Sequence, residues 1–173
     1  MFRHMTDLRS VHLEPLAMAL NLEREGKRFF LESAAKFKGK LARQTFEFLA
    51  NEEDKHIRRI EEFYRSIEQS GQTDQVTIER STAMDRLAAF QDELARLKDE
   101  IRPDATDIDA YHYALKFENG AELFYEKTMN ESSDPNIKRF YAWLIAEEEM
   151  HSKLIGSCLK FAQDPESWFT ERG

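Results

Sequence analysis

Apolar side chains recur every three or four residues along most of the chain, which is the spacing of one face of an amphipathic helix. The pattern predicts four long helices, at about 14–38, 40–69, 107–132 and 134–163. Gly39 and Gly71 are expected to end the first two helices, and Asp134 and Pro135 to cap and start the fourth one. A further amphipathic stretch, at about 82–101, lies between the second and third helices.

These helices form two hairpins joined by a long connection, so the sequence predicts an all-α four-helix bundle with an extra helix in its crossover. The chain is divided into an arm at 1–13, a bundle at 14–163 with the crossover at 71–106, and a tail at 164–173. Trp168 and Phe169 are expected to hold the tail against the bundle. The extra helix either covers the bundle or takes part in a dimer interface.

Composition supports a helical fold and narrows the function. The 173 residues include only two valines, which leaves little strand-forming material. The net charge of −8 argues against nucleic acid or anionic lipid as the main partner. No apolar run is long enough to span a membrane and no secretory leader opens the chain, so a cytoplasmic location is expected. The single cysteine, Cys158, excludes a disulfide framework and fits a reducing compartment.

The chain repeats itself with an offset of 95 residues, which aligns the first predicted hairpin with the second one. Both copies contain a Glu-x-x-His motif on the apolar seam of the hairpin's second helix. In the first copy, Phe46 and Leu49 precede the motif and Ile60 and Phe63 follow it. The first helix of each hairpin adds one glutamate to the same interior. The matched polar residues at core positions are Glu23, Glu53, His56, Glu118, Glu148 and His151.

Four glutamates at the centre of one bundle need compensating charge. A buried carboxylate without a partner costs on the order of several kcal/mol, and neighbouring carboxylates repel one another. No lysine or arginine lies in the seams of the two histidine-bearing helices. Two divalent cations would cancel four carboxylates and leave the imidazoles as neutral ligands. Oxygen and imidazole ligands suit iron, manganese and zinc, so these residues predict a dinuclear metal site.

The six residues lie in four segments, LEREGKRFFLESAAK, FLANEEDKHIRRIEEFY, ALKFENGAELFYEKT and LIAEEEMHSKLI. With these motifs, residues 14–162 resemble the ferritin-like di-iron proteins of the rubrerythrin-related branch. The resemblance implies a ferritin-like bundle that holds two iron ions, with zinc or manganese as substitutes. It also implies terminal carboxylates at Glu23 and Glu118, bridging carboxylates at Glu53 and Glu148, and one metal ion on each of His56 and His151.

The sequence departs from its resembled relatives at several positions. Rubrerythrins carry a second glutamate three residues after the ligand on the third helix, where this chain has Ala121. Glu122 follows, but it lies about 100° further around the helix. Rubrerythrins also carry a rubredoxin domain with Cys-x-x-Cys pairs, which one cysteine cannot supply, so an external electron-donor protein is expected. Asp54 stands where bacterioferritins place a haem-binding methionine, so haem is not expected.

Other residues near the predicted site allow two interpretations each. Glu52 and Glu147 also match across the repeat. Charged residues beside an apolar seam are usually solvated, and the alternative is that they support the metal ligands. Tyr111, Tyr125 and Tyr141 are expected in core packing, with hydrogen bonding or radical transfer near the metals as the alternative.

The resemblance implies an oxidoreductase in which two ferrous ions react with peroxide or O2, as in a peroxidase or ferroxidase. No catalytic side chain is assigned beyond the metal ligands. The main alternative is an iron-binding or storage protein without turnover. A bundle with structural zinc or manganese and a hydroxylase of an organic substrate are further alternatives. Ferritin-like chains commonly pair, so a homodimer is expected, and we favour a place in its interface for the extra helix.

Overall fold

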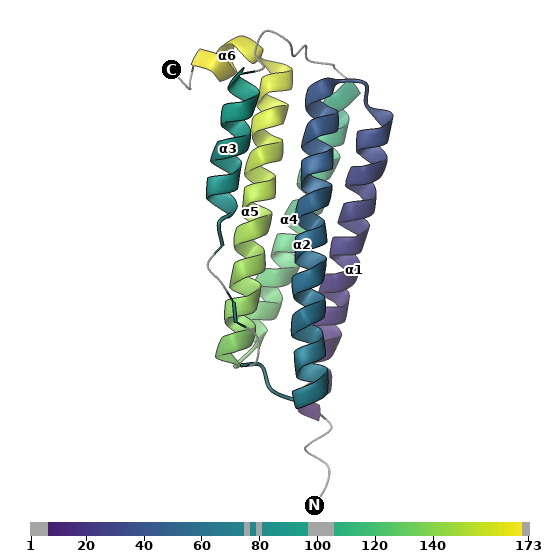
Figure 1. The fold of residues 1–173 in the computed structure, drawn as a ribbon, viewed down its shortest axis with the longest axis vertical. Coiled ribbons are helices and arrows are strands. Elements are labelled where there is room, and N and C mark those ends of the chain that lie inside the picture. The colour runs from purple at the N-terminus through teal and green to yellow at the C-terminus, as the bar shows by residue number, and fades with distance from the viewer. Residues whose placement is uncertain (1–6, 75–76, 79–80, 97–105, 171–173) are drawn as a thin grey trace, which may run out of the picture.

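The computed structural model describes residues 7–74, 77–78, 81–96 and 106–170, and every regular element within them is a helix. The helices are α1 (Asp7–Lys36), α2 (Lys40–Ser70), α3 (Ala83–Arg96), α4 (Thr106–Glu131), α5 (Pro135–Gln163) and α6 (Pro165–Thr170). The four long helices, α1, α2, α4 and α5, run alongside one another as a bundle (Figure 1). The predicted all-α, ferritin-like four-helix bundle is therefore confirmed.

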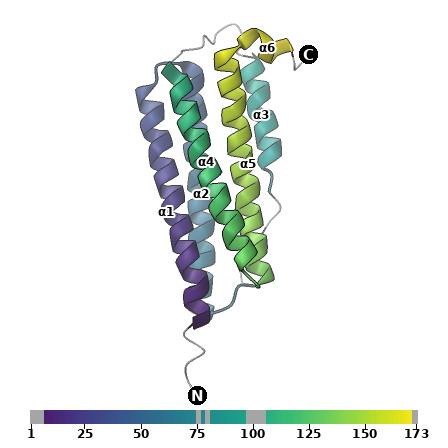
Figure 2. The same cartoon turned by 180° about the vertical axis from the view of Figure 1, so that it is seen from behind.

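The bundle consists of two hairpins, α1 with α2 and α4 with α5. Helix α3 packs against α5 on the side away from α1, as Figure 1 and Figure 2 both show. Ala83 and Leu87 of α3 are buried, and the Phe90 ring lies 5.0 Å from the Phe48 ring of α2, measured between centroids. The crossover helix therefore covers the bundle within one chain, and its part in a dimer interface stays a prediction.

The extra helix was expected at about 82–101, and the described part of it ends at Arg96. Residues 97–105 lie outside the described part of the chain, as does the side chain of Leu94. The predicted apolar face of this helix can therefore be followed only through Leu87 and Phe90, and both contact the bundle core.

Local sequence signals set the ends of the long helices. Gly71 adopts a left-handed conformation, with φ of 72°, and its N–H donates to the carbonyl of Ile67 at 2.8 Å to close α2. At the start of α5, the carboxylate of Asp134 accepts from the backbone N–H groups of Asn136 at 2.8 Å and Ile137 at 3.3 Å. Both ends agree with the positions expected from the sequence.

The start of the first helix was predicted wrongly. Helix α1 begins at Asp7 rather than near Glu14, so Pro15 lies inside the helix and residues 7–13 belong to it rather than to an arm. Proline deprives only one carbonyl, that of Val11, of its usual helical partner. Val11 is exposed, so water can replace that partner. The expected arm at 1–6 lies outside the described residues.

Two apolar clusters fill the bundle, one on each side of a polar layer. On α2, Leu49 belongs to the first cluster and Ile60 to the second one, and the first Glu-x-x-His motif lies between them. On α5, Leu144 and Ile155 flank the second motif in the same way. The polar layer is thus enclosed along the bundle axis, and the clusters hold its backbone in place.

Helix α6 folds back onto α5 through Trp168. Its indole Nε1 donates to Ser157 Oγ at 2.9 Å, and its ring meets the Phe161 ring edge-on. This is the role expected for Trp168, whereas the side chain of Phe169 lies outside the described part. Among the described residues, no helix combines the length and the apolar character that crossing a bilayer requires.

Candidate metal centre

The structure brings all six predicted ligands together in the polar layer. They come from all four long helices: Glu23 from α1, Glu53 and His56 from α2, Glu118 from α4, and Glu148 and His151 from α5. Each is at most 2% exposed. Helical periodicity explains this convergence, since each residue continues an apolar seam of its own helix.

The first Glu-x-x-His motif reaches across to the other helices through its imidazole. His56 Nδ1 lies 3.0 Å from Glu23 Oε2 on α1 and 3.3 Å from Glu148 Oε1 on α5. The same nitrogen lies 3.7 Å from Glu53 Oε2 of its own motif. One nitrogen of His56 therefore faces carboxylates from three helices.

The second motif mirrors this arrangement. His151 Nδ1 lies 3.3 Å from Glu53 Oε1, 3.3 Å from Glu148 Oε2 and 3.5 Å from Glu118 Oε1. The rings of His56 and His151 are stacked, with centroids 5.1 Å apart. The four motif residues each offer one ligand atom, and these atoms lie within 4.8 Å of one another.

The carboxylates around the two imidazoles favour their protonated form. Burial alone would lower their pKa values, because it disfavours the charged form. The carboxylates of Glu23, Glu147 and Glu148 around His56, and of Glu118 and Glu148 around His151, outweigh burial. As a result, the pKa values of both histidines are raised well above 6.5.

The carboxyl groups divide into two kinds. Burial and the charges of Glu53 and Glu148 raise the pKa of Glu23, and burial and the charge of Glu148 raise that of Glu118. Burial would raise the pKa of Glu53, but the neighbouring Glu23 carboxyl group and both imidazoles lower it to about 2. The pKa of Glu148 is lowered in the same way by Glu118 and the imidazoles. The carboxyl groups of α1 and α4 therefore favour the protonated form, and those of the two motifs favour the ionised form.

The residues fit a pair of metal ions. Among the described residues, no lysine or arginine pairs with the four glutamates, and Lys27 instead pairs with Asp54 at 2.6 Å. Within the described part of the chain, both carboxylate oxygens of Glu118 are buried without a hydrogen-bond partner. The same holds for Glu53 Oε1, Glu148 Oε1 and His151 Nδ1. Unsatisfied buried acceptors are costly, and oxygen with imidazole nitrogen is a donor set for iron, manganese or zinc.

The comparison with known families agrees with this geometry. Residues 14–159 match the sequence model of the family described as Rubrerythrin, a range that includes most of α1 and α5, all of α2 to α4, and all six predicted ligands. The chain belongs to the rubrerythrin family. Neither a curated protein nor a solved structure matches it.

The site of this rubrerythrin-family chain departs from the expected family pattern on α4. Ala121, at the position of the family's second glutamate, is buried. The neighbouring Glu122 is only half-buried, and burial and the charges of Glu149 and Glu126 raise its pKa. Glu122 therefore does not replace the missing carboxylate in the cluster.

One of the three tyrosines touches a predicted ligand. The hydroxyl of Tyr125 donates to Glu23 Oε1, and its ring lies 5.9 Å from the Tyr141 ring, measured between centroids. Tyr111 stacks on Phe46 in the apolar cluster, as core packing predicts. Tyr125 therefore combines packing with a hydrogen bond to the site.

The expectation that Glu52 and Glu147 are solvated is wrong. Both are 2% exposed, because Arg86 on α3 lies over them. Arg86 Nε donates to Glu52 Oε2 at 2.7 Å, and Arg86 Nη2 donates to Glu147 Oε2. The repeat marked both glutamates, but Arg86 lies in the crossover, outside the repeat, so no internal match pointed to it.

Proposed function

We propose that this protein is a dinuclear iron oxidoreductase that reduces peroxide or O2. The observation that carries the proposal is the convergence of six buried carboxylate and imidazole side chains from four helices, with several of their ligand atoms lacking a hydrogen-bond partner among the described residues. Two ferrous ions bound there would supply two electrons, the number that reduction of hydrogen peroxide to two water molecules consumes together with two protons.

The chain's own residues prepare the site for such a reaction. The four glutamates balance the charge of two divalent cations, and His56 and His151 add neutral ligands once they release their protons. The apolar clusters on both sides exclude bulk water. Tyr125 fixes the orientation of Glu23, and since burial and the charge of Glu23 raise its pKa, its hydroxyl keeps the proton that it donates.

A separate protein would return the electrons. The 173 residues contain one cysteine, Cys158, which is buried, and burial raises its pKa to about 12. A buried, protonated thiol is a poor redox partner. We therefore propose a separate electron-donor protein as partner for the catalytic cycle.

The test is an anaerobic stopped-flow experiment on protein loaded with two Fe(II) ions per chain. We expect peroxide, O2 or both to be consumed faster than by the same amount of free Fe(II), and repeatedly when a reductant is supplied. Consumption no faster than that of free Fe(II) would contradict the proposal. One round of oxidation without repetition would instead favour the iron-binding or storage alternative.

A further inference from the structure

The crossover makes a direct connection to the centre through two residues. Ser81 Oγ donates to Glu147 Oε1 at 2.6 Å and accepts from the backbone N–H of Ala83 at 3.1 Å, at the start of α3. One turn later, Arg86 donates to Glu52 and to Glu147, and its Nη1 reaches Thr82 Oγ1 at 2.6 Å. The first turns of α3 are thus tied to two glutamates that each precede a predicted metal ligand.

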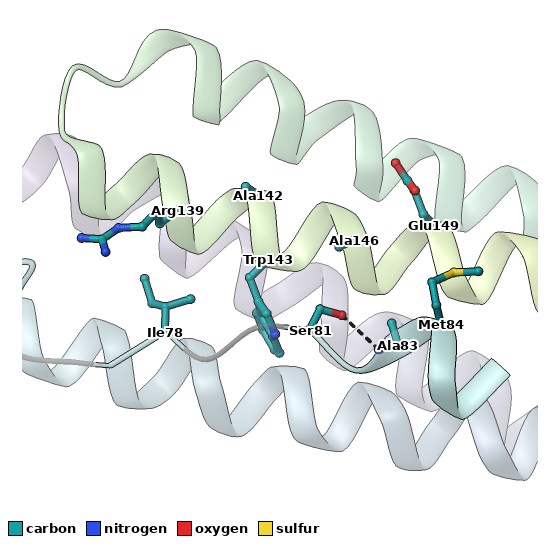
Figure 3. Close-up of a pocket in the computed structure, with 9 residues that line it drawn as sticks. All are labelled: Ile78, Ser81, Ala83, Met84, Arg139, Ala142, Trp143, Ala146 and Glu149. Atoms are coloured by element: carbon teal, nitrogen blue, oxygen red, sulfur yellow. Dashed lines mark hydrogen bonds between the residues drawn. The ribbon is translucent and has the colours of Figure 1, made fainter. Parts of the chain in front are cut away.

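Figure 3 shows how this segment runs. Ser81, Ala83 and Met84 lie beside α5, where they line a groove of about 550 Å³ together with Trp143. The Trp143 ring also meets the His56 ring edge-on, with centroids 5.6 Å apart. The crossover therefore follows the side of the bundle on which His56 lies.

Glu147 extends this connection to a metal ligand. Its Oε2 lies 3.6 Å from His56 Nε2, whereas His56 Nδ1 faces the carboxylates of Glu23 and Glu148. An imidazole that binds a metal through Nδ1 keeps its proton on Nε2. A carboxylate that faces this proton fixes the tautomer and the orientation of the ring.

The two halves of the site differ at this point. Neither Nε2 makes a hydrogen bond within the described residues, but His56 Nε2 has the Glu147 carboxylate 3.6 Å away, whereas His151 approaches the described carboxylates through Nδ1 alone. The repeat places carboxylates around Nδ1 of both histidines. The crossover lies between the two copies of the repeat, and its contacts with Glu147 extend to His56. The two metal positions are therefore inequivalent.

We propose that Arg86 is a positioning residue that couples docking of the crossover helix to metal binding at His56, acting through Glu147. This inference rests on the metal binding in the proposed function, but not on the reaction with peroxide or O2. Arg86 is suited to this role because its planar guanidinium reaches both glutamates at once. Without it, Glu52 would keep its ion pair with Lys55, whereas Glu147 would lose its arginine partner and be held toward His56 by Ser81 alone.

The test is a Co(II) titration of the metal-free full-length chain, followed by the visible absorption of bound Co(II). We expect two ions per chain in the wild type, with distinct affinities and spectra. Arg86→Gln should reduce the affinity for one of the two Co(II) ions about 10- to 100-fold and change the spectrum of that ion. The affinity for the other ion should not change. Arg86→Lys should restore part of the affinity, since it keeps the charge but loses the second contact.

Matched variants separate positioning from general damage. Arg96→Gln removes the same charge from the exposed end of α3 and should leave both ions unchanged. Glu147→Gln should reduce the affinity for the same ion as Arg86→Gln. In the double variant, the loss of binding free energy should be smaller than the sum of the losses in the two single variants. If Arg86→Gln does not fold, Ser81→Ala gives a milder test. It removes a donor to Glu147 and the acceptor for the N–H of Ala83 but leaves every charge in place, so it should reduce the affinity for the same ion by a smaller factor.

Reciprocity provides a second readout without any oxidant. If the crossover and the metal are coupled, metal binding must in turn stabilise the docked crossover. Hydrogen exchange of the amides of α3 should therefore slow when Co(II) binds to the wild type, and not when it binds to Arg86→Gln.

Two results would overturn the proposal. The first is an Arg86→Gln variant that loses affinity equally for both ions or for neither ion. The second is amide hydrogen exchange in wild-type α3 that does not change when metal binds. A wild type that binds Co(II) as expected but does not react with peroxide or O2 refutes only the proposed function. A wild type that binds no Co(II) refutes both.

Discussion

At the scale of single residues, the site is defined by where each buried charge finds its partner. Glu52 and Glu147 find a cation, Arg86, within the chain. Glu53 and Glu148 find only protonated imidazoles and other carboxyl groups. This difference separates the glutamates that support the site from those that fit a metal ion, although all four are equally buried.

Small residues at the site provide a residue-scale prediction. A Cβ added to Gly26 would lie 2.9 Å from Phe117 Cε1 and 3.4 Å from Glu53 Cδ, whereas one added to Gly120 would meet no atom within 4 Å. Gly120→Ala should raise the free energy of unfolding by about 0.5–1 kcal/mol, because alanine favours helix. For Gly26→Ala, the free energy of unfolding should be about 1–3 kcal/mol lower than for Gly120→Ala, because Phe117 must move. Urea denaturation measures both, and equal gains would contradict the packing described.

Single residues also show which features of the site are encoded in local sequence patterns and which depend on distant segments. The six predicted ligands could be found because each continues a seam and each has a counterpart in the repeat. The burial of Glu147 could not be found, because it depends on Ser81 and Arg86, whose segment is distant in sequence and has no counterpart. Burial caused by a neighbouring segment leaves no periodic signal in the buried residue's own helix.

At the scale of elements, the ends of the helices follow local chemistry where a cap or a glycine marks them. Gly71 and Asp134 mark their helix ends clearly, and the sequence predicts both. The start of α1 lacks such a mark, and Pro15 was interpreted as a first-turn residue when it lies a full two turns inside. A proline restricts a helix only through the one carbonyl that it leaves unpaired, so it does not by itself define a start.

The cap of α5 gives an element-scale prediction. Asp134→Ala removes the acceptor for two backbone N–H groups and for the Thr73 hydroxyl at 2.8 Å, and should lower the free energy of unfolding by about 0.5–2 kcal/mol. The control is Asp164→Ala, which removes the bond to Ser167 N at the start of the short α6 and should cost less. Thermal unfolding followed by circular dichroism compares the two. A larger loss for Asp164→Ala would contradict this account.

At the scale of the whole molecule, the polar layer makes stability depend on protons and metal together. With raised pKa values, the folded, metal-free chain binds more protons than the unfolded chain above pH 6.5. Stability contributed by His56 and His151 is therefore complete below pH 6.5 and is lost as the pH rises through their folded-state pKa values. Glu23 and Glu118, whose pKa values are also raised, act in the same direction from pH 4.5 upward.

The corresponding prediction compares metal-free and metal-loaded protein. Between pH 6.5 and pH 8, the free energy of unfolding of the metal-free chain should fall. The expected slope is up to about 1.4 kcal/mol per pH unit for each proton that the folded chain binds in excess of the unfolded chain. Stabilisation by metal should grow over the same range, because the imidazoles must release protons to bind it. Urea denaturation with a chelator and with Zn(II) measures both trends. A metal-free chain that gains stability with rising pH would contradict the raised pKa values of the two histidines.

The central claim is that the polar layer of this rubrerythrin-family bundle is a dinuclear metal site. The most direct measurement is an anaerobic Fe(II) titration of the metal-free protein that counts bound iron per chain. We expect two ions per chain in the wild type, and loss of bound iron in Glu53→Ala and in Glu148→Ala, each of which removes a carboxylate between the two imidazoles. Zero or one ion per chain in the wild type would contradict it.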